Sequence, residues 1–112
     1  MAKLPDPAIS NIFTLQRSLV ECLDSCTAME FRLIHQIGET AETLPELEEL
    51  QNIRERLASS CSRLHNLLMR IYQSQPTAPD DILELLYRSI AQTQASLDVS
   101  IASLLDIQRN WN

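Results

Sequence analysis

Apolar side chains recur at alternating intervals of three and four residues through three long segments of this 112-residue chain. In the first segment the repeat passes without a break through Ile12, Leu15, Leu19, Cys22, Cys26, Met29 and Leu33. This spacing keeps returning to one face of an α-helix and is typical of helices that pack lengthwise on one another. It predicts long helices rather than β-strands, whose two faces alternate at every residue.

The other two segments carry the same kind of repeat. The second contains Leu50, Ile53, Leu57, Ser60, Leu64, Leu67 and Ile71, in which Ser60 is the single polar interruption. The third repeats every seven residues at Leu83, Ile90, Leu97, Leu104 and Trp111, joined by Leu86, Thr93, Ser100 and Ile107. Because short connections make neighbouring helices antiparallel, we predict an all-α fold, an antiparallel up-down-up three-helix bundle of long, coiled-coil-like helices.

Helix-start signals divide the chain. Asp6, as an N-cap acceptor before Pro7, predicts a helix over about 7–37, or to 42 if the residues after Gly38 form a last turn. Residues 43–46 match a capping box, in which a Thr43 hydroxyl and a Glu46 carboxylate each bond a backbone amide. This box predicts a second helix over about 44–73. A similar signal at 77–80 predicts a third over about 79–109, all within one domain, 1–112.

Composition narrows the classes of function. Gly38 is the only glycine, so the chain has little material for phosphate-cradling loops or strained active-site turns. The sequence also shows no nucleophile with an adjacent base and no carboxylate dyad, and we therefore expect a protein that is not an enzyme. Nine Lys and Arg against 15 Asp and Glu give a net charge of −6, the wrong sign for binding nucleic acid or an anionic membrane.

The chain carries no secretory leader pattern and no run of uncharged apolar residues long enough for a membrane span. Its three cysteines, an odd number, are expected to be free thiols in a reducing compartment. These features predict a cytoplasmic protein.

Two pairs of potential metal ligands have a spacing of four residues, Cys22 with Cys26 and Cys61 with His65. Residues four apart share one face of a helix. Suppose that the connection between the first two helices is centred between Thr43 and Leu44. Cys26 and Cys61 then lie at the same position along the bundle axis, and so do Cys22 and His65. The four side chains would then suit zinc or copper(I).

Two other interpretations of the cysteines stay open. Cys22 and Cys26 occupy positions of the apolar repeat, where a buried thiol behaves as a small hydrophobic residue and needs no cofactor. Alternatively, Cys26 and Cys61 form a disulfide on oxidation.

The first helix is apolar over a wider arc than one neighbouring helix can cover. Either this surplus contacts both other helices, or part of it binds a second copy or another protein. A row of small residues on the third helix, at Ser89, Thr93, Ser96, Ser100 and Ser103, would similarly allow close approach of a helix, from inside the bundle or from a partner. The candidate partner-binding residues are Phe13, Val20, Leu23, Phe31, Ile34, Ser96 and Ser103.

These observations favour a non-catalytic interaction protein of the adaptor, scaffold or assembly-chaperone type. It would bind a segment of a partner protein, or form a homo-oligomer, through its helix faces. The alternative function is a metal-binding or thiol-redox-responsive bundle that uses Cys22, Cys26, Cys61 and His65.

Overall fold

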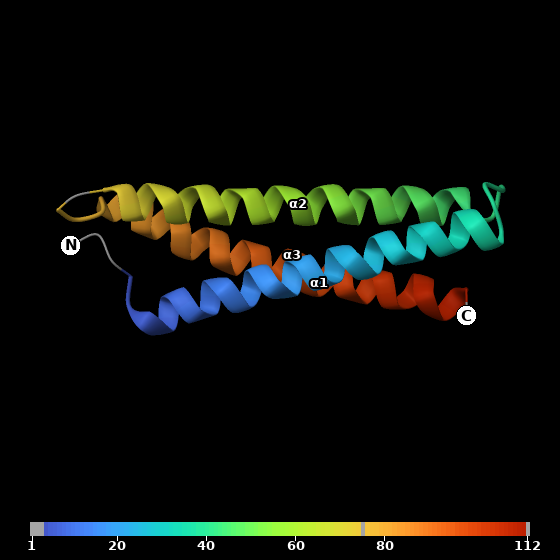
Figure 1. The fold of residues 1–112 in the computed structure, drawn as a ribbon, viewed down its shortest axis with the longest axis horizontal. Helices are drawn as coiled ribbons and strands as arrows, with labels where there is room; N and C mark the ends of the chain where they lie inside the picture. Colours follow the sequence, from blue (N-terminus) through green and yellow to red (C-terminus); the bar gives the residue numbers. More distant parts are fainter. Residues whose placement is uncertain (1–3, 75, 112) are drawn as a thin grey trace.

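Three antiparallel helices run up, down and up along the molecule (Figure 1). The computed structural model describes residues 4–74 and 76–111. The helices are α1 (Asp6–Gln36), α2 (Leu44–Gln73) and α3 (Asp80–Asn110), and together they form a rod of 56 × 19 × 18 Å. The described residues contain no β-strand. The predicted all-α three-helix bundle is confirmed. α1 ends at Gln36, close to the earlier of the two ends considered, and does not continue to 42.

The repeat of α1 forms its buried face. All seven predicted residues, from Ile12 to Leu33, are buried in the core. On α2, six of the seven predicted residues are buried, Ser60 is half-buried, and Leu68 joins the core. On α3, the buried residues are Leu86, Ser89, Thr93, Leu97, Ser100, Leu104 and Ile107. The remaining α3 residues of the repeat, Leu83, Ile90 and Trp111, are half-buried against this core.

The three helices do not share their contacts equally. α2 packs extensively against both α1 and α3, whereas α1 and α3 contact each other less. In the view of Figure 1, α1 and α3 cross each other while α2 runs past both. The contact between α1 and α3 is therefore the smallest of the three.

The predicted N-terminal caps are wrong. The N-cap residues of α1 and α3 are Pro5 and Pro79, and none of the three helices has a side-chain hydrogen bond at its N-cap. Thr43 does precede α2, but its hydroxyl is buried and donates to the carbonyl of Gly38 at 2.7 Å. The same oxygen accepts a hydrogen bond from the backbone N–H of Thr40 at 2.8 Å. The threonine therefore holds the preceding loop together instead of capping the helix.

The position of α1 along the bundle axis, relative to α2, also differs from the prediction. Because α1 ends at Gln36 and α2 begins at Leu44, the connection is centred on residue 40 and not between Thr43 and Leu44. Two contacts show the resulting alignment. The Cys26 thiol donates to the carbonyl of Leu50 at 3.1 Å, and Arg54 lies 3.6 Å from Glu30. Relative to the predicted alignment, α2 is displaced by about seven residues, or about 10 Å.

Gly38 ends the first helix. Its φ angle is +92°, in the region that residues with a side chain rarely adopt, and its N–H donates to the carbonyl of Leu33 at 2.9 Å. A Cβ added at Gly38 would meet no atom within 4 Å. The conformational demand at this position is therefore a property of the backbone alone.

We expect Gly38→Ala to lower the free energy of unfolding by about 1 kcal/mol, because alanine is strained at positive φ. Asparagine tolerates this region better, so Gly38→Asn should cost about half as much. Urea unfolding followed by circular dichroism measures both variants. Equal stability of the wild type and Gly38→Ala would contradict this role of the glycine.

Candidate functional site

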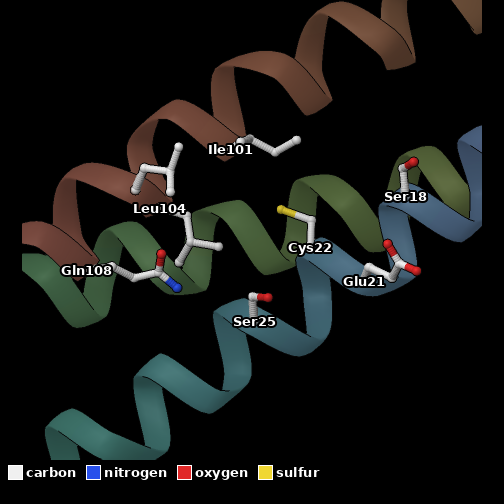
Figure 2. Close-up of a pocket in the computed structure, with 8 residues that line it drawn as sticks. Ser18, Glu21, Cys22, Ser25, Ile101, Leu104 and Gln108 are labelled. Atoms are coloured by element: carbon white, nitrogen blue, oxygen red, sulfur yellow. The ribbon is translucent and has the colours of Figure 1, made fainter.

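A groove opens between α1 and α3, the pair of helices with the smallest contact in the bundle. Its volume is about 280 Å³. It is lined by Ser18, Glu21, Cys22 and Ser25 from α1 and by Ile101, Leu104, Leu105 and Gln108 from α3. Figure 2 shows the Cys22 sulfur pointing from α1 toward Ile101 and Leu104 of α3. The groove is thus an opening in the packing of the bundle and not a separate loop-built site.

The groove exists because its two walls are built from residues of different size. α1 contributes the small side chains of Ser18, Cys22 and Ser25, which do not fill the space beside α3. Of the larger apolar residues on α3, Leu104 is buried, whereas Ile101 and Leu105 are 38% and 48% exposed. The result is an apolar surface within reach of solvent.

The polar groups of the groove lie mainly on its α1 side. Glu21 lines it and forms an exposed ion pair with Arg17, whose Nε is 3.0 Å from the Glu21 carboxylate. Two serines from α1 and Gln108 from α3 complete the polar lining. Such a lining suits an apolar segment that also carries hydrogen-bonding or basic groups.

None of the predicted partner-binding residues lines this groove, and Cys22 was assigned to a metal site. The sequence does contain a signal for it. Ile101 and Leu105 are four residues apart and flank the buried position of Leu104, so they widen the apolar face of α3 on one side. That signal alone does not reveal that the facing residues of α1 are small.

The predicted residues on α1 divide into two groups. Phe13, Val20, Phe31 and Ile34 are exposed, at 56%, 57%, 63% and 42%. Leu23 is half-buried and packs against the core. The surplus apolar arc of α1 is therefore partly internal and partly open to solvent.

The row of small residues on α3 lies largely inside the bundle. Ser89, Thr93 and Ser100 are buried, and Ser96 and Ser103 are half-buried. The Ser100 hydroxyl accepts a hydrogen bond from Arg56 of α2 at 3.3 Å. At Ser100, the row faces α2.

The four proposed metal ligands do not converge. Cys22 and Cys26 are buried, Cys61 is half-buried and His65 is exposed. The observed alignment of α1 and α2 separates the predicted partners by about two helical turns. Among residues 4–74 and 76–111, no group of three or more His, Cys, Asp or Glu side chains is placed to hold a metal ion. All three cysteines are free thiols.

The environments of the two buried thiols make them poor nucleophiles. Burial raises the pKa of Cys22. Burial, with the negative charge of Glu30 as a second cause, raises the pKa of Cys26 to about 11. Because the thiolate is the reactive form, both groups are largely unreactive near neutral pH.

Comparisons with known proteins return no matching family model, no matching curated protein and no matching solved structure. In the part of the chain that the structure describes, none of the helices combines the length and the apolar character that crossing a bilayer requires.

We expect one fast-reacting thiol when the native protein is treated with a disulfide reagent such as DTNB at pH 8. Half-buried Cys61 should react first, while Cys22 and Cys26 should react only as the protein unfolds, because burial both blocks access and raises their pKa. In the control variant Cys61→Ser, the fast phase should disappear. Two or three fast thiols would show that α1 opens readily.

A pair of serines on α3 tests the energetics of the small-residue row. The Ser96 hydroxyl is buried without a hydrogen-bond partner, whereas that of Ser100 is bonded to Arg56. Since an unsatisfied buried hydroxyl costs about 1–3 kcal/mol, Ser96→Ala should raise the free energy of unfolding by about 1 kcal/mol. Ser100→Ala should lower it by about 0.5 kcal/mol. Urea unfolding of both variants is the measurement, and equal effects would contradict this assignment.

Proposed function

We propose that this protein is a non-catalytic interaction module of the adaptor, scaffold or assembly-chaperone type. It holds an apolar helical segment of a partner protein in the groove between α1 and α3. The observation that carries the proposal is the partial exposure of Ile101 and Leu105 beside the buried apolar floor formed by Cys22 and Leu104. Apolar side chains left open along a seam between two helices are a common docking surface for a further helix.

The energetics favour a partner that fits the groove along its length. Burying a whole leucine or isoleucine side chain stabilises by about 1.5–3 kcal/mol, so covering the exposed parts of Ile101 and Leu105 contributes about 1 kcal/mol each. Neither contact is sufficient alone. The small side chains of Ser18 and Ser25 support the proposal because they allow a partner helix to approach closely and add contacts along the groove.

Charge narrows the kind of partner. The protein has a net charge of −6, and Glu21 is the acidic residue that lines the groove. A partner segment that carries Lys or Arg beside its apolar residues complements this surface, whereas the phosphates of nucleic acids and anionic lipids are repelled. The proposed partner is therefore a protein. We place the interaction in the cytoplasm, where three free cysteines stay reduced.

We expect the protein to select amphipathic helical peptides from a displayed peptide library, and Leu105→Glu to weaken their binding at least tenfold. A bound apolar peptide would desolvate the new carboxylate, which also adds a second negative charge to the groove lined by Glu21. Fluorescence anisotropy of a selected peptide measures the effect.

Val99→Glu is the matched control, because Val99 is also exposed on α3 but does not line the groove. It should bind the peptide as the wild type does. Circular dichroism and urea unfolding check that both variants keep the fold. Failure to select any peptide, or equal binding by the Leu105→Glu and Val99→Glu variants, would refute the proposed site.

A further inference from the structure

Trp111 joins the end of α3 to both other helices. Its indole N–H donates to the carboxylate of Glu46, in the first turn of α2, at 3.2 Å. Its backbone carbonyl accepts a hydrogen bond from the guanidinium of Arg32 on α1 at 2.9 Å. The end of α3 lies at the same end of the rod as the connection between α1 and α2 (Figure 1). We call these three residues the Trp111 clasp.

The clasp replaces the usual means of ending a helix. α1 ends at a glycine with positive φ, whereas α3 ends at Asn110 and is followed by Trp111 with φ of −119°. The last carbonyls of a helix have no partner within the helix, and Arg32 binds one just beyond that end. The ring of Trp111 is half-buried and packs against the core. Hydrogen bonds to a carboxylate are among the stronger kinds, so the contact with Glu46 adds to this anchoring.

The clasp lies directly beyond one end of the groove. Gln108 lines the groove and precedes Trp111 by three residues, which is less than one helical turn. On α1, Arg32 follows Ser25 of the groove by seven residues, or about 10 Å. Because α1 and α3 have the smallest contact of the three helix pairs, the α3 wall of the groove depends strongly on contacts beyond it.

We propose that Trp111 is a positioning residue for the groove. Its bonds to Glu46 and Arg32 hold the last turns of α3 against α1 and keep the groove in the shape that receives a partner. This inference rests on the proposed function, because it assigns a role within the same site. Without the clasp, the end of α3 has the low opening free energy of an untethered helix terminus. The α3 residues of the groove then move away from α1, and Cys22 becomes accessible.

Two buried thiols distinguish such a local opening from loss of the whole fold. Cys22 lines the groove, whereas Cys26 donates to the carbonyl of Leu50 on α2. Opening of the end of α3 exposes Cys22 alone, while global unfolding exposes both thiols. The ratio of their labelling rates therefore measures the position of the α3 wall separately from the overall stability.

The test labels the full chain, carrying Cys61→Ser, with N-ethylmaleimide under native conditions and locates the label by tandem mass spectrometry. Trp111→Phe keeps an aromatic ring and removes the indole donor, and Glu46→Ala removes the acceptor. Each should raise the ratio of Cys22 to Cys26 labelling at least tenfold, a size that one hydrogen bond to a charged group can supply. Because both changes delete the same bond, the double variant should show no larger effect than either single one.

Glu48→Ala is the matched control, because Glu48 is exposed two residues from Glu46 and its loss changes the net charge equally. It should leave the ratio at the wild-type value. An unchanged ratio in the Trp111→Phe and Glu46→Ala variants would overturn the proposal. An equal rise in the labelling of Cys22 and Cys26 would also overturn it, since the clasp would then support only the fold as a whole.

Fluorescence reports the clasp directly, because Trp111 is the only tryptophan of the chain. In the Glu46→Ala variant the emission should move to longer wavelength, and quenching by acrylamide should increase as the indole enters solvent. The Glu48→Ala variant should match the wild type in both measurements. Wild-type emission and quenching in Glu46→Ala would show that this bond does not hold the indole, against the proposal.

Peptide binding separates this proposal from the proposed function. A peptide selected on the wild type should bind the Trp111→Phe variant at least threefold more weakly, because a wall that is not held in place must be ordered on binding. Equal binding by the two proteins would overturn the positioning role. Failure to select any peptide would refute the partner site, and the labelling ratio would still decide whether the clasp holds the α3 wall.

Discussion

Lengthwise burial of one apolar face per helix is the interaction on which the rest of this structure depends. Leucine, isoleucine, methionine and cysteine side chains from all three helices form a single continuous core. Each large side chain buried in this way contributes about 1.5–3 kcal/mol. The helix N-termini add little, because none carries a side-chain cap. Tertiary packing, more than the helix ends, therefore maintains these helices of about 30 residues.

Burial alone would allow the helices to slide along one another, and a few polar contacts select one alignment. Thr43 binds the Gly38 carbonyl in the first turn, and Glu30 of α1 pairs with Arg54 of α2. At the end of α3, the indole of Trp111 donates to Glu46 at 3.2 Å, and Arg32 donates to the Trp111 carbonyl at 2.9 Å. These contacts join all three helices at one end of the rod. They fix the positions of the helices along the rod axis, and therefore which residues of α1 and α3 meet in the groove.

The groove and the exposed apolar residues of α1 both reflect the composition of this helix. On the side toward α3, its small residues leave a groove, and on the side away from the core its phenylalanines and aliphatic residues remain exposed.

The sequence by itself determined the helical class, the extent of the three helices and the buried face of each. The three-and-four spacing encodes these features locally, and all seven predicted core residues of α1 are buried. The alignment of α1 with α2 was decided only by tertiary structure, because contacts between the two helices mark it: the Cys26 thiol with the Leu50 carbonyl, and Glu30 with Arg54. That alignment separates Cys26 from Cys61 and leaves the four candidate ligands apart. The sequence shows only one wall of the groove, the widened apolar face of α3 at Ile101 and Leu105, because the small residues of α1 that face it lie about 80 positions earlier in the chain.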